Sequence, residues 1–164
     1  MPAIDTPLLI VGHGPAALVI AKTASGRGLP SLVIGHEPID AGCAVELGPE
    51  ALAAMAPHGV LEVLRPYAAT QDPFAIAPLL FEQGLKHHCI ADMLVTIFDE
   101  MVYEASSAVA GVLTDGRRRW SVTADHMIDV SELPTELNSA IVAGAAAANS
   151  LVDSFTDRRP RTSG

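Results

Sequence analysis

The sequence predicts an α/β fold with a parallel β-sheet, on the strength of three observations. An apolar run at residues 8–11 leads through a glycine-rich turn into a helical pattern over residues 16–25. Residues 32–34 then have the composition of a second short, buried strand, and residues 101–130 contain several further strand-like segments. A strand, a helix and a second strand in this order are typical of a βαβ unit, whose two strands run parallel.

The turn after the first strand has the spacing Gly12-x-Gly14-Pro15-x-Ala17. Gly12 permits a tight turn, and Gly14 removes a side chain so that a pyrophosphate can approach the backbone. Pro15 suits the first position of a helix, Ala17 allows the helix to pack closely on the strand, and the free N–H groups at the helix start favour an anion. We therefore predict a phosphate-binding loop formed by Gly12, Gly14, Pro15, Ala16 and Ala17.

Glu37 follows the second predicted strand. Nineteen residues lie between Ala17 and Glu37, close to the separation of about 20 that is typical of the carboxylate that binds a ribose in a dinucleotide-binding unit. The combination of loop and acid predicts such a unit more strongly than either alone. The alternative is a parallel strand pair with a glycine-rich connection and a surface glutamate.

The middle of the chain is predicted to be helical, over residues 49–56, 60–64 and 78–93, with breaks at prolines. His87, His88 and Cys89 fall inside the last of these helices. Because adjacent residues on a helix point about 100° apart, these three side chains do not converge on one ion. We therefore expect no metal site there.

Strand-like segments follow from residue 95. Residues 95–98 are expected to join the parallel sheet, residues 101–105, 108–113 and 117–122 to form a small β-meander around the turn at Asp115-Gly116, and residues 126–130 to form the last strand. Arg117, Arg118 and Arg119 lie beside that turn. Since successive residues of a strand point to opposite faces, they indicate a solvated hairpin tip rather than a phosphate clamp.

A final helix is predicted over residues 136–154, capped by Thr135, with a surface of small residues at 144–148. We expect one domain over residues 1–154 and a flexible C-terminal tail over residues 155–164.

The composition restricts the partners and the location. A net charge of −9, from 10 basic and 19 acidic residues, opposes binding to nucleic acid and to anionic membranes. Cys43 and Cys89 do not form a Cys-x-x-Cys pair, so neither a thiol–disulfide centre nor a structural zinc site is expected. No segment approaches the roughly 18 apolar residues of a membrane span, and a cytoplasmic location is the default. The Ala-rich and Val-rich composition also allows a homo-oligomer.

The loop from Gly12 to Leu18, with the sequence GHGPAAL, resembles the GAGPAGL-type loop of FAD-dependent oxidoreductases. The segments around residues 45–68 and 114–131, and the last helix, are similar to parts of the FAD domain of flavin monooxygenases of the aromatic-hydroxylase type. This resemblance implies a Rossmann-like, three-layer FAD/NAD(P)-binding fold with a small β-meander. It also implies that Glu37 binds the adenosine ribose of FAD and that Val102 contacts the adenine through its backbone.

The same resemblance is incomplete near the end of the chain. The family's A-D-x-V-I-x-A-x-G pattern is matched by Ala124 to Ile128, but Asp129-Val130-Ser131 replaces its glycine-containing ending. Ser131 is the residue at this ending that we expect to contact the cofactor. The resemblance also implies that the N-terminus of the last helix faces the flavin. The Gly-Asp motif that those enzymes use to bind the ribityl and pyrophosphate portion is missing here.

The resulting functional hypothesis is a small FAD-binding flavoprotein, an oxidoreductase of monooxygenase-like type that lacks a separate substrate domain. NAD(P)H would be its electron donor, a small molecule its substrate, and a partner chain or second subunit would complete the pocket. Alternatives are a non-catalytic relative that binds a nucleotide or a partner protein, and an NAD(P)-binding reductase domain. No catalytic residue is identified: His36, His58, His126 and Asp129 are candidates only because they titrate.

Overall fold

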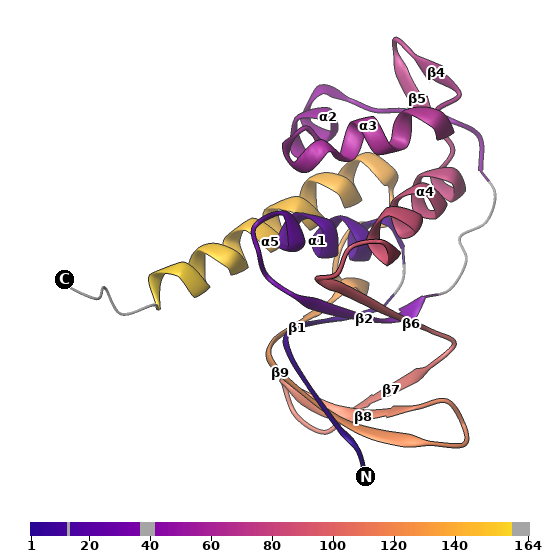
Figure 1. Ribbon diagram of the computed structural model, residues 1–164. Helices are drawn as coiled ribbons and strands as arrows, with labels where there is room; N and C mark the ends of the chain where they lie inside the picture. Colours follow the sequence, from indigo (N-terminus) through magenta and orange to yellow (C-terminus); the bar gives the residue numbers. More distant parts are fainter. Residues whose placement is uncertain (13, 37–41, 159–164) are drawn as a thin grey trace.

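The computed structural model describes residues 1–12, 14–36 and 42–158 (Figure 1). Its helices are α1 (Pro15–Gly26), α2 (Pro49–Met55), α3 (Val60–Leu64), α4 (Pro78–Ile90) and α5 (Leu137–Asp157). Its strands are β1 (Ala3–Val11), β2 (Ser31–His36), β3 (Val45–Glu46), β4 (Thr70–Gln71), β5 (Phe74–Ile76), β6 (Val95–Asp99), β7 (Val102–Ala105), β8 (Ala110–Thr114) and β9 (Arg119–Asp129).

A six-stranded sheet with the order β6-β2-β1-β9-β8-β7 forms the centre of the molecule. The strands β6, β2, β1 and β9 are parallel, whereas β8 and β7 continue the sheet as antiparallel strands. Helices α1 and α4 belong to the connections between parallel strands, as such connections require. The predicted α/β fold with a parallel sheet and a β-meander is therefore confirmed.

Three layers are visible in Figure 1, where the helices cover one face of the sheet and the meander lies across the other. Leu8, Ile10 and Val33 belong to the larger core beneath the helices. Leu9 and Leu32 belong to a smaller core toward the meander. This alternation follows from the two-residue period of a strand, and it explains why the strands read as continuous apolar runs: both of their faces are buried.

The strand β9 differs from the prediction, which had two separate strands at residues 117–122 and 126–130. In the structure one continuous strand pairs with β8 from Arg119 to Thr123 and with β1 from Ser121 to Asp129. The polar residues in its middle do not end it, because the strand passes from the meander into the central sheet and keeps its backbone hydrogen bonds throughout.

Other element boundaries also differ. The last helix begins at Leu137 with Glu136, and not Thr135, as its N-cap, and it continues to Asp157. Residues 155–157, which we predicted to belong to a flexible tail, thus lie within this helix. Helix α4 ends at Ile90 rather than at residue 93. The three-stranded sheet β3-β5-β4 was not predicted, because strands of two or three residues are too short to produce an alternating pattern.

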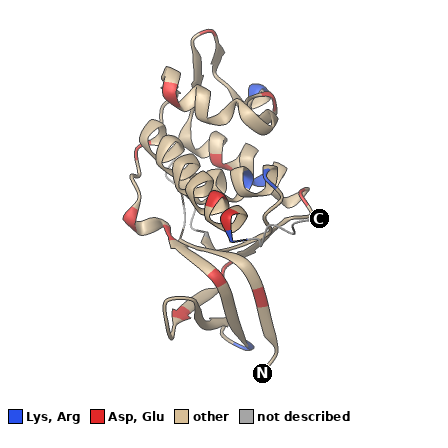
Figure 2. Cartoon of the chain, turned by 90° about the vertical axis from the view of Figure 1, so that its left-hand side faces the viewer, with Lys and Arg blue, Asp and Glu red and all other residues tan. Residues whose placement is uncertain are grey.

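Acidic residues occur in both the helical layer and the meander, and basic residues are fewer and scattered (Figure 2). Within the described part of the chain, no helix is both long and apolar enough to cross a membrane.

Candidate nucleotide-binding site

The turn from β1 into α1 lies at the carboxyl edge of the sheet and is held by Gly12. Its N–H donates a hydrogen bond to the carbonyl of Ile34 on β2, at 2.9 Å. Its φ of +116° belongs to the region that L-residues rarely adopt. A Cβ at Gly12 would also lie 2.3 Å from Cγ2 of Val130. Gly12 therefore permits both the turn and close packing against the segment that follows β9.

Gly14 is the N-cap of α1 and has a φ of +108°. Unlike Gly12, it has no close neighbour among the described residues: apart from its own chain neighbours, none of their atoms lies within 4 Å of the place that a Cβ would take. Pro15 follows at the first helical position, and no side chain caps this helix start. The first backbone N–H groups of a helix have no partner within the helix, so this start presents donors that no described side chain caps, an arrangement that favours an anion.

Ala16 and Ala17 contribute backbone rather than side chain to the loop. Their side chains are buried in the core beneath the helices. A Cβ at Gly144 of α5 would lie 3.1 Å from the carbonyl oxygen of Ala16. The loop is thus supported from behind by a helix that approaches it closely.

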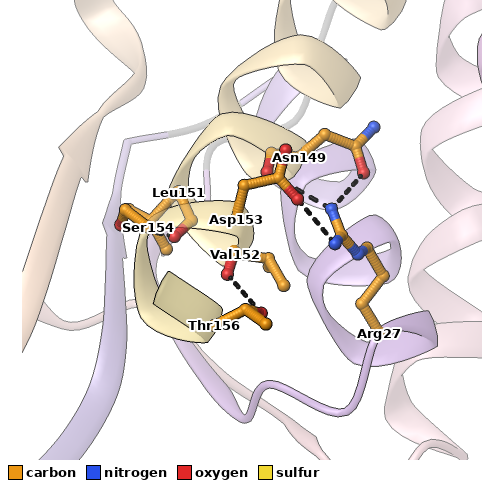
Figure 3. Close-up of polar contacts among 7 residues, drawn as sticks. All are labelled: Arg27, Asn149, Leu151, Val152, Asp153, Ser154 and Thr156. Atoms are coloured by element: carbon orange, nitrogen blue, oxygen red, sulfur yellow. Dashed lines mark hydrogen bonds and ion pairs between the residues drawn. The ribbon is translucent and has the colours of Figure 1, made fainter. Parts of the chain in front are cut away.

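The other end of α1 is also attached to α5 (Figure 3). The guanidinium of Arg27 donates to the carbonyl and side-chain oxygens of Asn149, at 3.3 and 3.2 Å, and to the carboxylate of Asp153 at 2.7 Å. Contacts near Gly144 at one end and near Asp153 at the other show that the two helices run in the same direction. Both helices therefore start at the carboxyl edge of the sheet.

Two further predicted site residues, Val102 and Ser131, belong to other segments than the loop. Val102 lies on β7, the last strand at the meander end of the sheet, and its side chain is exposed. Ser131 follows β9, and both its N–H and its hydroxyl donate to one carboxylate oxygen of Asp129, at 2.9 and 2.7 Å. Ser131 thus has its polar groups engaged within the chain. Glu37 lies outside the described residues.

Sequence reasoning missed Glu136, which lies at the start of α5. Its carboxylate accepts hydrogen bonds from the N–H groups of Asn138 and Ser139, at 3.1 and 2.9 Å. The bonds from Ser139 and then Asn138 lower the pKa of Glu136, so the cap is ionised. The sequence favoured Thr135 because hydroxyl side chains are the commoner caps. A carboxylate therefore covers the first turn of α5.

The histidines proposed as titratable candidates lie elsewhere or are engaged. A Cβ at Gly26 would overlap the His58 ring, which places His58 at the far end of α1 from the loop. The ring of His126 packs edge-on against Phe155, with the ring centroids 4.7 Å apart. The side chain of His36 lies outside the described part. Among the residues that the structure describes, no group of three His, Cys, Asp or Glu side chains is arranged to hold a metal ion.

Comparison with known proteins supports the fold rather than a particular activity. No family model and no curated protein matches the sequence. Among solved structures, the chain is similar to p-nitrophenol 4-monooxygenase from Pseudomonas putida, with 17% identity and a TM-score of 0.61 over 79% of this chain and 41% of that one. It is also similar to the anhydrotetracycline hydroxylase OxyS from Streptomyces rimosus, with 17% identity and a TM-score of 0.59 over 77% and 31% of the two chains.

A third similar structure is the flavin-dependent monooxygenase PieE, determined with FAD and substrate. It shares 19% identity and a TM-score of 0.58 over 89% of this chain and 33% of its own. The fold is thus the Rossmann-like α/β fold found in the FAD-binding part of flavin-dependent monooxygenases. The chain spans less than half the length of each of these three proteins.

The described residues fit one part of FAD better than the other. The space at Gly14 and the uncapped start of α1 suit a diphosphate. Beyond β9, by contrast, the donors of Ser131 and of the α5 start are already bonded to Asp129 and Glu136. The described part of the site therefore suits a diphosphate, and the donors of Ser131 and of the α5 start are bonded within the chain.

Proposed function

We propose that this chain binds FAD through the loop of Gly12, Gly14, Pro15, Ala16 and Ala17, and that it works as a small flavoprotein oxidoreductase. The observation that carries the proposal is the position of Gly14 at an uncapped helix start, where no described residue beyond its chain neighbours comes within 4 Å of its Cβ position. The fold supports it, because the similar solved structures include flavin-dependent monooxygenases. In this proposal Glu37 binds the adenosine ribose and Val102 contacts the adenine through its backbone.

In this proposal, the flavin and the protein chain have different roles. Bound flavin supplies the redox chemistry. The chain supplies N–H donors and a helix dipole for the phosphates, and α5 keeps the loop rigid through Gly144. No described residue is assigned as general acid or base, so we propose that a small-molecule substrate site is completed by a partner chain or a second copy.

The test is the visible absorption spectrum of the purified protein before and after addition of FAD, compared between Gly14→Val and Gly28→Val. Both glycines have a positive φ, and neither has an atom within 4 Å of its Cβ position. Both substitutions therefore place a β-branched side chain at a backbone conformation that L-residues rarely adopt. They lie at opposite ends of α1, so only Gly14→Val places a branched side chain in the proposed phosphate path.

We expect the wild type and Gly28→Val to retain flavin and Gly14→Val to lose it while keeping its circular dichroism spectrum. Equal flavin retention in the two variants would move the cofactor away from this loop. A wild-type protein that ignores FAD would overturn the proposal as a whole.

A second candidate is a non-catalytic relative that binds a nucleotide or a partner protein. The engagement of Ser131 by Asp129 favours it, because the residue expected to touch the cofactor is already bonded within the chain. Anaerobic addition of NADH or NADPH to the FAD-loaded protein separates the two candidates. Bleaching of the flavin band supports the oxidoreductase, whereas FAD binding without bleaching by NADH or NADPH supports the second candidate.

A further inference from the structure

We propose that the chain recognises the adenosine diphosphate half of FAD alone and gives the flavin half no hydrogen bonds from the β9–α5 side. This inference rests on the proposed function and specifies which part of the ligand supplies the affinity. Three features of the described residues lead to it. They are the place of the loop in the strand order, the distance by which the start of α5 projects beyond the start of α1, and the hydrogen bonds that engage donors near the start of α5.

The sheet order determines in which direction a dinucleotide extends. Strand β1 lies between β2, which follows it in the chain, and β9, which comes much later. Ligands of open α/β sheets bind at such a reversal of strand order, outside the carboxyl ends of the strands. With the ribose-binding acid expected after β2, the adenosine lies toward β2, and the second half of the ligand extends toward β9 and α5.

Helix α5 reaches further beyond the sheet than α1. Gly144 contacts Ala16 near the start of α1, and it is seven residues after Leu137, the first residue of α5. At 1.5 Å per residue, the start of α5 projects about 10 Å beyond the loop. The second half of a dinucleotide that leaves the loop on this side would meet the first turn of α5.

Two backbone donors of that first turn are already engaged. Glu136 accepts from the N–H groups of Asn138 and Ser139. The side chain of Asn138 is itself bonded on both sides, accepting from the N–H of Gly48 at 2.8 Å and donating to the carbonyl of Glu46 at 3.0 Å. A ligand would have to displace a carboxylate to reach these groups.

In the segment between β9 and α5, hydrogen-bond donors are likewise bonded to an acidic side chain of the chain itself. Asp129 holds the N–H and the hydroxyl of Ser131, and the methyl group of Val130 occupies the space beside Gly12. Two carboxylates, Asp129 and Glu136, thus accept hydrogen bonds from donors of Ser131, Asn138 and Ser139, on the side where the flavin half would lie. Their negative charges also oppose the electron-rich pyrimidine edge of a flavin.

The test is a calorimetric titration of the wild-type chain with ADP and with FAD, and a competition between them. The expected result is that ADP displaces FAD and that the two dissociation constants agree within about threefold, a difference smaller than one ordinary hydrogen bond gives. FAD binding more than tenfold tighter than ADP would overturn this inference and leave the proposed function intact. Absence of binding by both ligands would overturn the proposed function, and the inference with it.

A pair of variants tests the role of Glu136 separately. Glu136→Ala frees the N–H groups of Asn138 and Ser139, whereas Glu132→Ala removes a nearby exposed carboxylate that is not the cap of α5. We expect Glu136→Ala to tighten FAD relative to ADP by about three- to tenfold, and Glu132→Ala to leave the ratio unchanged. An unchanged ratio in Glu136→Ala, with ADP still bound, would contradict the assignment.

Discussion

Val130 occupies the space that a side chain at Gly12 would need. Its Cγ2 lies 2.3 Å from the Cβ position of Gly12, and Val130 is itself buried. Because Gly12 ends the first strand and Val130 follows the last one, this contact joins two segments that are far apart in the sequence. The first glycine of the loop is thus required by the packing of this chain, whereas no described residue beyond its chain neighbours lies within 4 Å of the Cβ position of Gly14.

This contact predicts an energetic coupling between the two positions. Gly12→Ala should lower the free energy of unfolding by about 3 kcal/mol, from the positive φ and from the overlap with Val130. Val130→Ala should cost about 2 kcal/mol through the cavity that it leaves. The double variant should cost less than the sum by about 1 kcal/mol, because the overlap is relieved while the backbone strain remains. Urea unfolding of the four proteins measures this, and strict additivity would contradict the contact.

Lys22 and Asp92 form a largely buried ion pair between α1 and the end of α4, with a nitrogen–oxygen distance of 3.0 Å. Burial alone would raise the pKa of Asp92. Hydrogen bonds from Ser25 and from the N–H of Leu94, together with Lys22, outweigh it and lower the pKa from 3.8 to about 2. Asp92→Asn should therefore lower the free energy of unfolding by about 3 kcal/mol at pH 7, because Lys22 is left buried without its partner.

The same pair predicts a pH dependence. Since the pKa of Asp92 is lower in the folded state, its stabilising contribution is complete above the ordinary value of 3.8 and is lost as the pH falls through about 2. The contribution is about 2 kcal/mol. The difference in unfolding free energy between wild type and Asp92→Asn should shrink between pH 4 and pH 2. A constant difference over this range would show that the carboxylate is not stabilised by folding.

Arg27 provides a contrasting prediction. Its bond to Asp153 is short, but the side chains are 31% and 66% exposed. Exposed ion pairs contribute roughly 0–1 kcal/mol, so Arg27→Ala should lower the free energy of unfolding by less than about 1 kcal/mol. The effect should decrease further at high salt. A loss as large as that of Asp92→Asn would mean that the attachment of α1 to α5 at this end governs the fold.

The two cysteines should differ in reactivity. Cys89 is fully buried, and burial raises the pKa of its thiol to about 12, whereas Cys43 is exposed. Because the thiolate is the reactive species, we expect a thiol reagent such as Ellman's reagent to modify one cysteine per native chain and two per unfolded chain. The Cys43→Ser variant should react only after unfolding. Rapid reaction of native Cys43→Ser would place Cys89 nearer to solvent.

Local signals predicted the first part of the site and long-range contacts determined the rest. The turn at Gly12 and Gly14 and the helix after it follow from residues adjacent in the sequence, and the structure contains them as predicted. The contact of Val130 with Gly12 joins residues more than a hundred positions apart, and no local pattern encodes such a distance. Gly144 carried a signal, as a small residue in a long helix, but the sequence did not show that Ala16 was its neighbour.

The β9–α5 segment shows a second limit. The sequence singled out Asp129 only as a titratable residue in the altered family ending, and Glu136 only as the first residue of the predicted last helix. Their role depends on which N–H groups lie within reach, which only the backbone path determines. Because Glu136 is the N-cap, the helix starts at Leu137, one residue later than the predicted start at Glu136.

Gly144 yields a prediction in which two opposing effects are compared. Gly144→Ala in the middle of α5 should gain about 1 kcal/mol of helix propensity. The new Cβ would lie 3.1 Å from the carbonyl oxygen of Ala16 and 3.4 Å from Cβ of Val19, and overpacking of this kind costs about 1–3 kcal/mol. Because the atom at 3.1 Å is backbone, it yields only if the start of α1 moves. We expect a net loss of stability together with weaker FAD binding.

Gly84→Ala on α4 is the matched control. Its Cβ would meet the ring of Tyr67 at 2.8 Å, a partly exposed side chain rather than backbone. We expect it to change the unfolding midpoint without changing the affinity for FAD, since Tyr67 is not part of the loop. Thermal unfolding and flavin titration of both variants measure the two effects. If both glycines changed FAD affinity equally, support of the loop by α5 would not be a specific property of Gly144, and the loop would respond only to overall stability.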